Sequence, residues 1–212
     1  MVSSNNILNV ILFMLNIQLT SNLEAGIDEA GRGCLAGPVT AAAVILPSTI
    51  QLPLLNDSKK LTKKQRYDLR PLIEKYSISF GIANVFQEEI DKINILNASI
   101  LAMHYALEKL NKNPKFIIVD GNHFHCFKEI PHKCIVKGDQ KFQNIAAASV
   151  LAKTYRDDYM KKIGTNFPQY DWRKNKGYPT QSHRAAIKKF GVTKHHRKSF
   201  KLLPSQMEIS FN

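Results

Sequence analysis

The stretch AGIDEAGRGCLAGPVTAAAVIL, residues 25–46, predicts a short strand, a glycine-rich turn and a second, largely buried strand. Further strands are predicted at residues 77–83, 116–119 and 134–136, where short apolar runs stand beside turn residues. Helices are predicted within residues 62–76, 93–113, 143–163 and 180–190. Strands that come first and then alternate with helices indicate an α/β protein, in which helices pack on a mixed sheet.

Three of these elements carry local signals. Thr62 and Gln65 have the spacing of a capping box, and Pro71 predicts a kink or an interruption in the helix that follows. One face of that helix carries Leu69, Leu72, Ile73 and Tyr76. Residues 77–83 alternate, with Ile78, Phe80 and Ile82 on one side, which predicts a half-buried strand. A long amphipathic helix that ends before Pro114 is predicted by Ile93, Leu96, Ile100, Met103, Leu107 and Leu110.

The composition is that of one globular domain. The chain has 212 residues, of which 44% are hydrophobic and 22% are charged, enough to bury a core without disulfide or metal staples. Residues 7–15 are the only candidate signal sequence, and they lack a positive n-region because the first Lys or Arg is Arg32. The three cysteines show no C-x-x-C spacing, which suits a reducing compartment. We therefore expect a cytoplasmic protein with free thiols and no membrane association.

The charge is unevenly distributed along the chain. The formal net charge is +13, and residues 153–201 alone carry 14 Lys or Arg against 3 Asp or Glu. Residues 1–152 are nearly balanced, with 16 basic and 13 acidic residues. A basic C-terminal quarter beside a balanced body indicates a polyanionic partner.

Four acidic residues stand at the ends of predicted strands. Asp28 and Glu29 end the first strand, Asp120 follows the run Phe-Ile-Ile-Val, and Asp139 follows Cys-Ile-Val-Lys-Gly. Ligand sites in α/β sheets often lie at strand ends, so these carboxylates are expected to converge. Because adjacent strand residues point to opposite faces, Asp28 and Glu29 can share a site only if the strand ends or bends there, or if Glu29 contributes its backbone.

Convergent carboxylates repel one another and need a counter-charge. Their oxygen atoms, with no His or Cys beside them, favour Mg²⁺ or Mn²⁺ over zinc. Inside a basic envelope, two such ions can activate a water molecule and stabilise the leaving oxygen of a phosphodiester. The sequence thus predicts a metal-dependent enzyme that acts on a nucleic-acid backbone.

The residues around these carboxylates resemble type 2 ribonuclease H, the ribonuclease HII family, over about residues 24–200. The string DEAGRG at residues 28–33 is followed by LAGPV and an apolar strand. The other matching segments are DSKKL at 57–61, VDG at 119–121, KGD at 137–139, AAASVLAK at 146–153 with Arg156 and Asp157, GYPT at 177–180 with His183, and HRKSF at 196–200.

The resemblance implies an RNase H-like fold, with a mixed five-stranded sheet flanked by helices and a small C-terminal helical subdomain. It implies an endoribonuclease that hydrolyses the RNA strand of RNA–DNA hybrids and incises 5′ of single ribonucleotides in duplex DNA, leaving 3′-hydroxyl and 5′-phosphate ends. The implied metal and catalytic residues are Asp28, Glu29, Asp120 and Asp139. The implied substrate-binding residues are Gly31, Arg32 and Gly33, in the loop that approaches the ribonucleotide, and Tyr178, which packs on the adjacent sugar.

The residue chemistry agrees with these implied roles. Glycines allow a backbone to approach a sugar closely, and a 2′-hydroxyl can both donate and accept hydrogen bonds. An aromatic ring accommodates a deoxyribose but would be crowded by an additional hydroxyl. The expected partners are hybrids and ribonucleotide-containing duplexes, and the expected oligomeric state is a monomer. The expected divisions are an N-terminal extension at 1–22, a catalytic domain at 23–160 and a basic helical subdomain at 161–212 packed on the same core.

Alternative interpretations account for parts of the sequence. A non-catalytic nucleic-acid-binding protein would account for the basic tail but not for the carboxylates. A type 3 ribonuclease H would carry a further N-terminal domain, for which the 27 residues before Asp28 are too few, and Glu in place of Asp139. Asp157 could replace Asp139 as the fourth carboxylate, but a pairing with a nearby cation is the preferred interpretation.

Several polar residues keep open roles at this stage. A zinc site is conceivable at His123, His125, Cys126, His132 and Cys134, although their spacing fits no standard finger. His183 could serve a structural hydrogen bond or catalysis. Phosphate contacts are possible for Ser58, Lys59, Lys60, Lys137 and Lys153.

Overall fold

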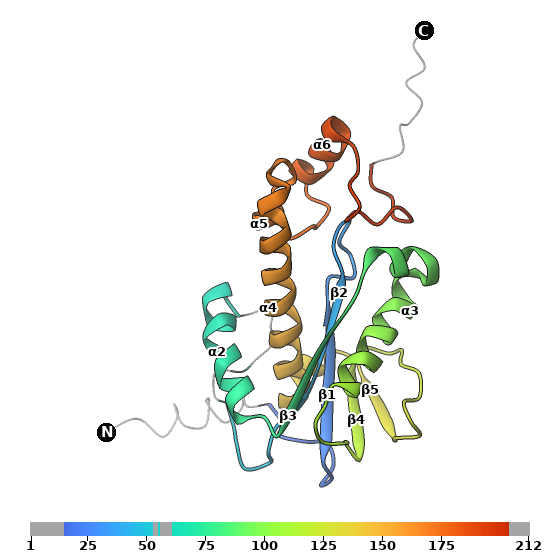
Figure 1. Cartoon of the computed structure of the whole chain (residues 1–212). Coiled ribbons are helices and arrows are strands. Elements are labelled where there is room, and N and C mark those ends of the chain that lie inside the picture. Colours follow the sequence, from blue (N-terminus) through green and yellow to red (C-terminus); the bar gives the residue numbers. More distant parts are fainter. Residues whose placement is uncertain (1–14, 53–54, 56–60, 204–212) are drawn as a thin grey trace, which may run out of the picture.

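The computed structural model describes residues 15–52, 55 and 61–203, and within them five strands form one mixed sheet in the order β3-β2-β1-β4-β5 (Figure 1). The strands are β1 (Glu24–Ala30), β2 (Val39–Ile45), β3 (Ser79–Val85), β4 (Phe116–Asp120) and β5 (His132–Ile135). This confirms the predicted α/β class and the mixed five-stranded sheet flanked by helices.

The strand directions place three chain segments at the same edge of the sheet. β2 runs antiparallel to both β1 and β3, whereas β4 runs parallel to β1 and β5 runs parallel to β4. The carboxyl ends of β1, β4 and β5 therefore meet at one edge, where the predicted acidic residues follow.

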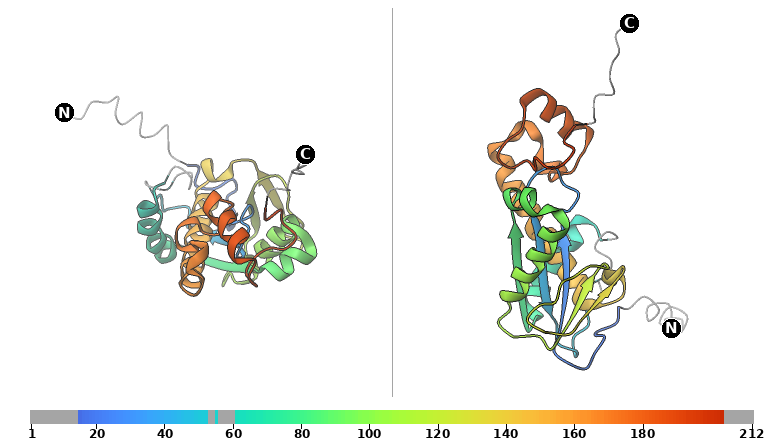
Figure 2. Two further views of the ribbon diagram at one scale, coloured as in Figure 1. Left: turned by 90° about the horizontal axis from the view of Figure 1, so that it is seen from above. Right: turned by 90° about the vertical axis from the view of Figure 1, so that its right-hand side faces the viewer.

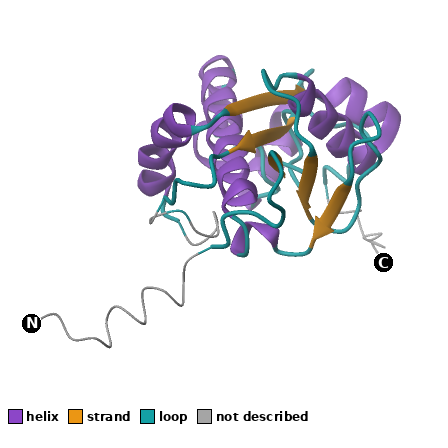
Figure 3. Cartoon of the chain, turned by 90° about the horizontal axis from the view of Figure 1, so that it is seen from below, coloured by secondary structure: helices purple, strands orange, loops and turns teal. Residues whose placement is uncertain are grey.

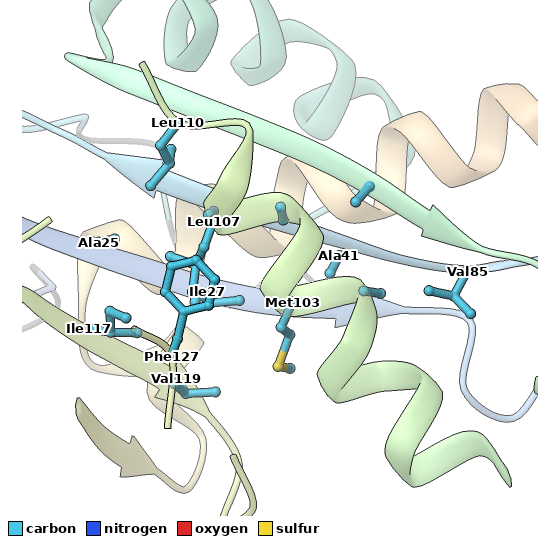
Figure 4. Packing of buried hydrophobic residues seen from close by; sticks show 14 of the residues in the cluster. Ala25, Ile27, Ala41, Val85, Met103, Leu107, Leu110, Ile117, Val119 and Phe127 are labelled. Carbon is cyan, nitrogen blue, oxygen red and sulfur yellow. The ribbon is translucent and has the colours of Figure 1, made fainter. Parts of the chain in front are cut away.

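Helices cover both faces of the sheet, as Figure 3 shows from below. The helices α4 (Gln143–Asn166) and α2 (Lys63–Tyr76) pack on one face, where the alanine-rich part of α4 lies against β1 and β2. The helix α3 (Gln87–Glu108) packs on the other face. There Met103 and Leu107 lie against Ile27 of β1 and Val119 of β4 in a continuous apolar core (Figure 4).

A small helical unit lies beyond the carboxyl end of β1 (Figures 1 and 2). It contains η2 (Pro168–Tyr170), α5 (Trp172–Asn175) and α6 (Gln181–Phe190), and it packs around the fully buried Trp172. Thr180 caps α6 by accepting from the His183 N–H, and Gly191 ends the helix, as predicted. Because α4 runs continuously from the sheet into this unit, the domain boundary at residue 160 stays a prediction.

Three local expectations are corrected by the structure. α2 continues through Pro71 as one helix, with its predicted capping box present, and Leu72 and Tyr76 are exposed rather than packed. In β3 the small residues form the more buried face, because Gly81 lies directly against the Ala106 carbonyl of α3. Phe80 and Ile82 pack on the other face of the sheet, in the apolar cluster that contains residues of α2 and α4, so both faces of this strand are covered.

The long helix α3 begins earlier than predicted and is broken near its start. Asn94 has a φ of 64°, and its side chain accepts hydrogen bonds from the N–H groups of Leu96 and Asn97. Asn94 thus caps a second helical segment, and the predicted apolar stripe is buried only after this break, with Leu96 exposed.

Two further expectations concern the whole chain. Cys34, Cys126 and Cys134 are free thiols, as predicted. Among the described residues, no helix is both long and apolar enough to cross a bilayer. The candidate signal stretch at 7–15 lies outside the described residues except for Leu15.

Candidate active site

A pocket of about 290 Å³ lies at the sheet edge formed by the carboxyl ends of β1, β4 and β5. Its lining residues are Asp28, Glu29, Ala30, Gly31, Arg32, Gly33, Asp120, Asp139, Ser149, Lys153 and Tyr178. All eight residues that the resemblance implies as catalytic or substrate-binding are among them, together with Lys153 from the candidate phosphate contacts. The roles assigned to these residues stay predictions.

The register of the parallel strands brings Asp28 and Asp120 together. Ile27 pairs with Val119, so the next residue on each strand is an aspartate. The Gly138 N–H donates to Asp120 Oδ1 at 2.7 Å, which ties the turn after β5 to the end of β4. This turn is the 3₁₀ segment η1 (Gly138–Gln140), and it carries the buried Asp139 into the pocket.

Asp28 faces α4, the helix that carries Lys153, one of the two basic residues that line the pocket. Gly26, two residues earlier on the same face, touches the α4 backbone at Asn144, which leaves no space for a side chain there. The Ser149 hydroxyl of α4 hydrogen-bonds to the Asp28 carboxylate, and Lys153 follows one helical turn later. The helix thus presents a hydroxyl and an ammonium group to the acidic edge.

Glu29 reaches the same pocket although β1 does not end at this residue. It pairs in register with Ala41, and β1 continues to Ala30. β4 ends one step earlier, at Asp120, so the sheet is open beside Glu29 and both of its faces reach the edge. Glu29 also lines a smaller adjoining pocket against α3, and its Oε1 accepts from the Arg32 guanidinium at 3.2 Å.

Burial and mutual repulsion destabilise the charged forms of the carboxylates at this edge. Burial raises the pKa of Asp28 well above its usual range, and the negative charges of Glu29 and Asp120 raise it further. Burial also raises the pKa of Glu29, while the Arg32 guanidinium opposes this rise. The edge therefore carries more negative charge than its protein surroundings neutralise, which is the electrostatic condition that a bound cation relieves.

The donor set of the pocket fits a hard divalent cation. The lining residues offer carboxylate and hydroxyl oxygens, and none of them is a His or Cys. In the described part of the chain, no three His, Cys, Asp or Glu side chains form a closed metal-binding group, so the carboxylates line a wall rather than enclose an ion. Mg²⁺ is commonly held in this open manner, by one or two carboxylates together with water and substrate phosphates.

The rest of the pocket lining comes mainly from the loop Gly31–Gly33 and from Tyr178. Gly31 has a φ of +93°, a conformation that favours glycine. A Cβ atom on Gly33 would meet no atom within 4 Å, so the backbone there borders open space. Tyr178 is 39% exposed, and its hydroxyl lies near the buried Cys34 thiol. An aromatic ring and an accessible backbone thus line the same pocket as the carboxylates.

Other residues highlighted by the sequence lie elsewhere. His183 is fully buried under Tyr178, where Trp172 donates to its Nε2 at 2.9 Å, a structural arrangement. Asp157 lies near Lys153 and raises its pKa, against the dominant lowering by burial. His123 lines the smaller pocket beside Glu29. Ser58, Lys59 and Lys60 lie outside the described residues.

Three residues that shape the site were not predicted from the sequence. Ser149 could have been found from its position one helical turn before Lys153. Arg156 and Arg197 lie behind the Gly31–Gly33 loop with 1% and 0% exposure, and each donates three hydrogen bonds to main-chain carbonyl groups. No local pattern marks such long-range contacts.

Comparisons with known proteins agree with this architecture. Residues 25–203 match the sequence profile of the family described as Ribonuclease HII. The Ribonuclease HII of Christiangramia forsetii is 64% identical over 198 residues, which cover 93% of this chain and 100% of that protein.

Solved structures share the fold. Ribonuclease H2 from Pyrococcus horikoshii OT3 has a TM-score of 0.71 at 25% identity, covering 84% of this chain and 94% of that one. The Bst-RNase HIII complex with Mn²⁺ has a TM-score of 0.69 at 15% identity, covering 91% of this chain and 70% of that one, and shows likeness of fold alone.

Proposed function

The chain belongs to the ribonuclease HII family, and we propose that Asp28, Glu29, Asp120 and Asp139 are its metal-binding and catalytic carboxylates. The family assignment makes the protein an endoribonuclease, which cleaves the RNA strand of RNA–DNA hybrids and ribonucleotides embedded in DNA. It favours this enzyme over the non-catalytic binding protein considered from the sequence. The observation that carries the proposal is the convergence of four acidic residues, from three strand ends, on one pocket.

We propose Mg²⁺ or Mn²⁺ as the cofactor, with two ions during catalysis. Asp28 and Asp120 would hold an ion between them, because they are neighbours in the parallel register and repel each other without one. Glu29 and Asp139 would complete the protein ligands from either side. When bound, such ions lower the pKa of a water molecule and stabilise the negative charge on a leaving oxygen.

The chain's own residues position the substrate around this acidic edge. The Ser149 hydroxyl orients the Asp28 carboxylate, and the Lys153 ammonium, partly buried on the same helix, would hold a phosphate of the scissile strand. Hydrolysis adds water oxygen to phosphorus and breaks the bond to the 3′ oxygen, leaving 3′-hydroxyl and 5′-phosphate ends. We propose that incision occurs 5′ of the ribonucleotide.

Recognition of the ribonucleotide is proposed for the loop Gly31–Gly33 and for Tyr178, which line the same pocket. The backbone of Gly31, Arg32 and Gly33 can approach a sugar closely and offers neutral donors to a 2′-hydroxyl, which DNA lacks. The exposed face of Tyr178 would pack on the neighbouring deoxyribose. Hybrids and ribonucleotide-containing duplexes are therefore the proposed substrates of a monomeric enzyme.

The proposal is tested by the substitution Asp120→Asn. It keeps the shape of the side chain and its acceptor oxygen for the Gly138 N–H but removes the charge. We expect incision of a duplex with one internal ribonucleotide to fall at least ~100-fold, because charge stabilisation at the reacting phosphate is lost. Binding and thermal unfolding should change little.

The matched control is Asp157→Asn, which removes an acidic charge close to Lys153 but outside the pocket lining. Its incision rate should stay within about threefold of the wild type, because Asp157 does not line the pocket and acts on Lys153 only through its charge. Undiminished incision by purified Asp120→Asn, with Mg²⁺ present, would reject the assignment of the carboxylates.

A further inference from the structure

Arg197 is a buried cation whose hydrogen bonds all go to backbone. Its side chain is 0% exposed. Nη2 donates to the Gly31 carbonyl and Nη1 to the Arg32 carbonyl, both at 2.8 Å, and Nε donates to the Gly37 carbonyl at 3.0 Å. The Asp91 carboxylate stabilises the charged guanidinium, but burial has the larger and opposite effect and lowers the pKa of Arg197 to about 10, so burying this charge is costly. Such an arrangement indicates a requirement other than packing.

Arg156 holds the same loop through other carbonyl groups. It is 1% exposed, and its Nε donates to the Pro38 carbonyl at 2.9 Å and its Nη2 to the Ala36 carbonyl at 3.1 Å. Nη1 donates to the Lys176 carbonyl at 2.9 Å, two residues before Tyr178. One guanidinium therefore joins loop 31–38 to the segment that carries the exposed tyrosine.

Together the two arginines fix which way the loop's peptide groups point. In a planar trans peptide, the carbonyl of one residue and the N–H of the next point in opposite directions, and the described backbone contains no cis peptide bond. With the Gly31 and Arg32 carbonyls turned toward Arg197, the N–H groups of Arg32 and Gly33 point away from it, and both of these residues line the pocket. Among the described residues, no protein acceptor takes up these two N–H groups.

We propose that Arg197 and Arg156 are positioning residues for ribonucleotide recognition: they hold loop 31–38 by its carbonyl oxygens and so present the Arg32 and Gly33 N–H groups to the substrate's 2′-hydroxyl. Neither arginine lines the pocket, so both act through the loop rather than by touching the substrate. The inference rests on the proposed function, since it explains how that function distinguishes RNA from DNA.

The test measures the preference for a ribonucleotide, defined as the ratio of two dissociation constants. Full-length Asp120→Asn protein is titrated, with Mg²⁺, into a duplex containing one ribonucleotide and into the all-DNA duplex of the same sequence. Arg197→Lys is then added to this background, because a lysine keeps the charge but lacks the planar fork that holds two adjacent carbonyls. We expect the preference to fall roughly tenfold, the value of one or two neutral hydrogen bonds, while affinity for the all-DNA duplex stays within about twofold.

The matched control is Arg184→Lys. Arg184 also donates to main-chain carbonyls, those of Lys201 and Leu202, in the same small helical unit but away from the loop. Its replacement should leave the preference unchanged, which separates loop positioning from a general loss of stability. Thermal unfolding accompanies each variant, and Arg156→Lys provides the same test should Arg197→Lys fail to fold.

The possible outcomes separate this inference from the function on which it rests. A parent protein that shows no preference would overturn the proposed recognition and this inference with it. A parent with a clear preference that folded Arg197→Lys and Arg156→Lys both retain would overturn the role of the arginines alone.

Discussion

At the scale of single residues, Gly31 and Gly33 stand two positions apart in one loop but are glycines for different reasons. A Cβ on Gly31 would lie 1.9 Å from the Nε of the buried Arg156, and its φ of +93° already disfavours other residues. A Cβ on Gly33 would enter open space beside the pocket. Gly31 is thus required by the protein's interior, and Gly33 leaves room for a ligand.

This difference predicts opposite phenotypes for two alanine substitutions. Gly31→Ala should lower the free energy of unfolding by about 2 kcal/mol or more, since it combines backbone strain with a clash against a packed side chain. Gly33→Ala should leave stability within about 0.5 kcal/mol of the wild type, as at an unconstrained surface position, yet slow incision at a single ribonucleotide. Urea unfolding and a gel-based incision assay measure the two effects. Equal losses of stability in both variants would contradict the distinction.

At the scale of elements, a buried histidine pair joins α6 to the segment that follows it. The His183 Nδ1–H donates to the Tyr178 carbonyl, so its Nε2 accepts from Trp172 Nε1 at 2.9 Å. The His196 Nδ1 accepts from the Thr193 N–H, which leaves its Nε2–H to face the His183 Nε2 at 3.3 Å. The network is satisfied only when both imidazoles are neutral.

This network predicts a loss of stability in acid. Burial, together with the neighbouring His183 and His195, lowers the pKa of His196 to about 4 in the folded protein. Between pH 6.5 and about 4 the unfolded chain therefore binds more protons than the folded protein. The contribution of neutral His196 to the free energy of unfolding is fully present above pH 6.5 and is lost as the pH falls through this window. It amounts to about 3 kcal/mol.

Urea unfolding from pH 7 to pH 4 measures this contribution. His196→Gln should flatten the acid decline relative to wild type, whereas His125→Gln, at an exposed position, should not. Parallel declines in wild type and His196→Gln would show that this imidazole does not set the acid limit.

Structural features that depend on residues within one element could be predicted from the sequence, whereas features that depend on contacts between elements could not. The caps at Thr62 and Thr180 depend on residues three positions away, and both are present. The break at Asn94 escaped prediction because the apolar spacing runs through it without interruption. The small face of β3 was predicted to be the exposed one, but a close approach by α3 requires small residues there.

At the scale of the whole molecule, the acidic edge could be predicted from local sequence patterns, whereas the long-range contacts that hold the neighbouring loop could not. Asp28 lies near the end of β1, Asp120 ends β4 and Asp139 follows β5, and parallel pairing brings such ends together, so their meeting was predictable. The contacts of Arg197 with loop 31–38 span about 160 residues of chain, and no periodicity encodes them. Local patterns thus predicted the chemical groups, and only the fold revealed what holds them.

The net charge of +13 and the neutral loop N–H groups predict different responses to salt. Affinity of Asp120→Asn protein for an all-DNA duplex should fall at least about tenfold between roughly 50 and 200 mM KCl, because each phosphate contact releases counterions. The ribonucleotide preference should stay constant within about twofold over this range, because the N–H donors carry no net charge.

Replacing the exposed Lys188 and Lys189 of α6, at the pocket end, by Gln should reduce the salt slope by up to about 1 for each phosphate that the protein no longer neutralises. Lys115→Gln, at the opposite end of β4, serves as the control and should leave the slope unchanged. A preference that disappears together with the overall affinity would mean that the protein recognises ribonucleotides through phosphate charge rather than through the loop.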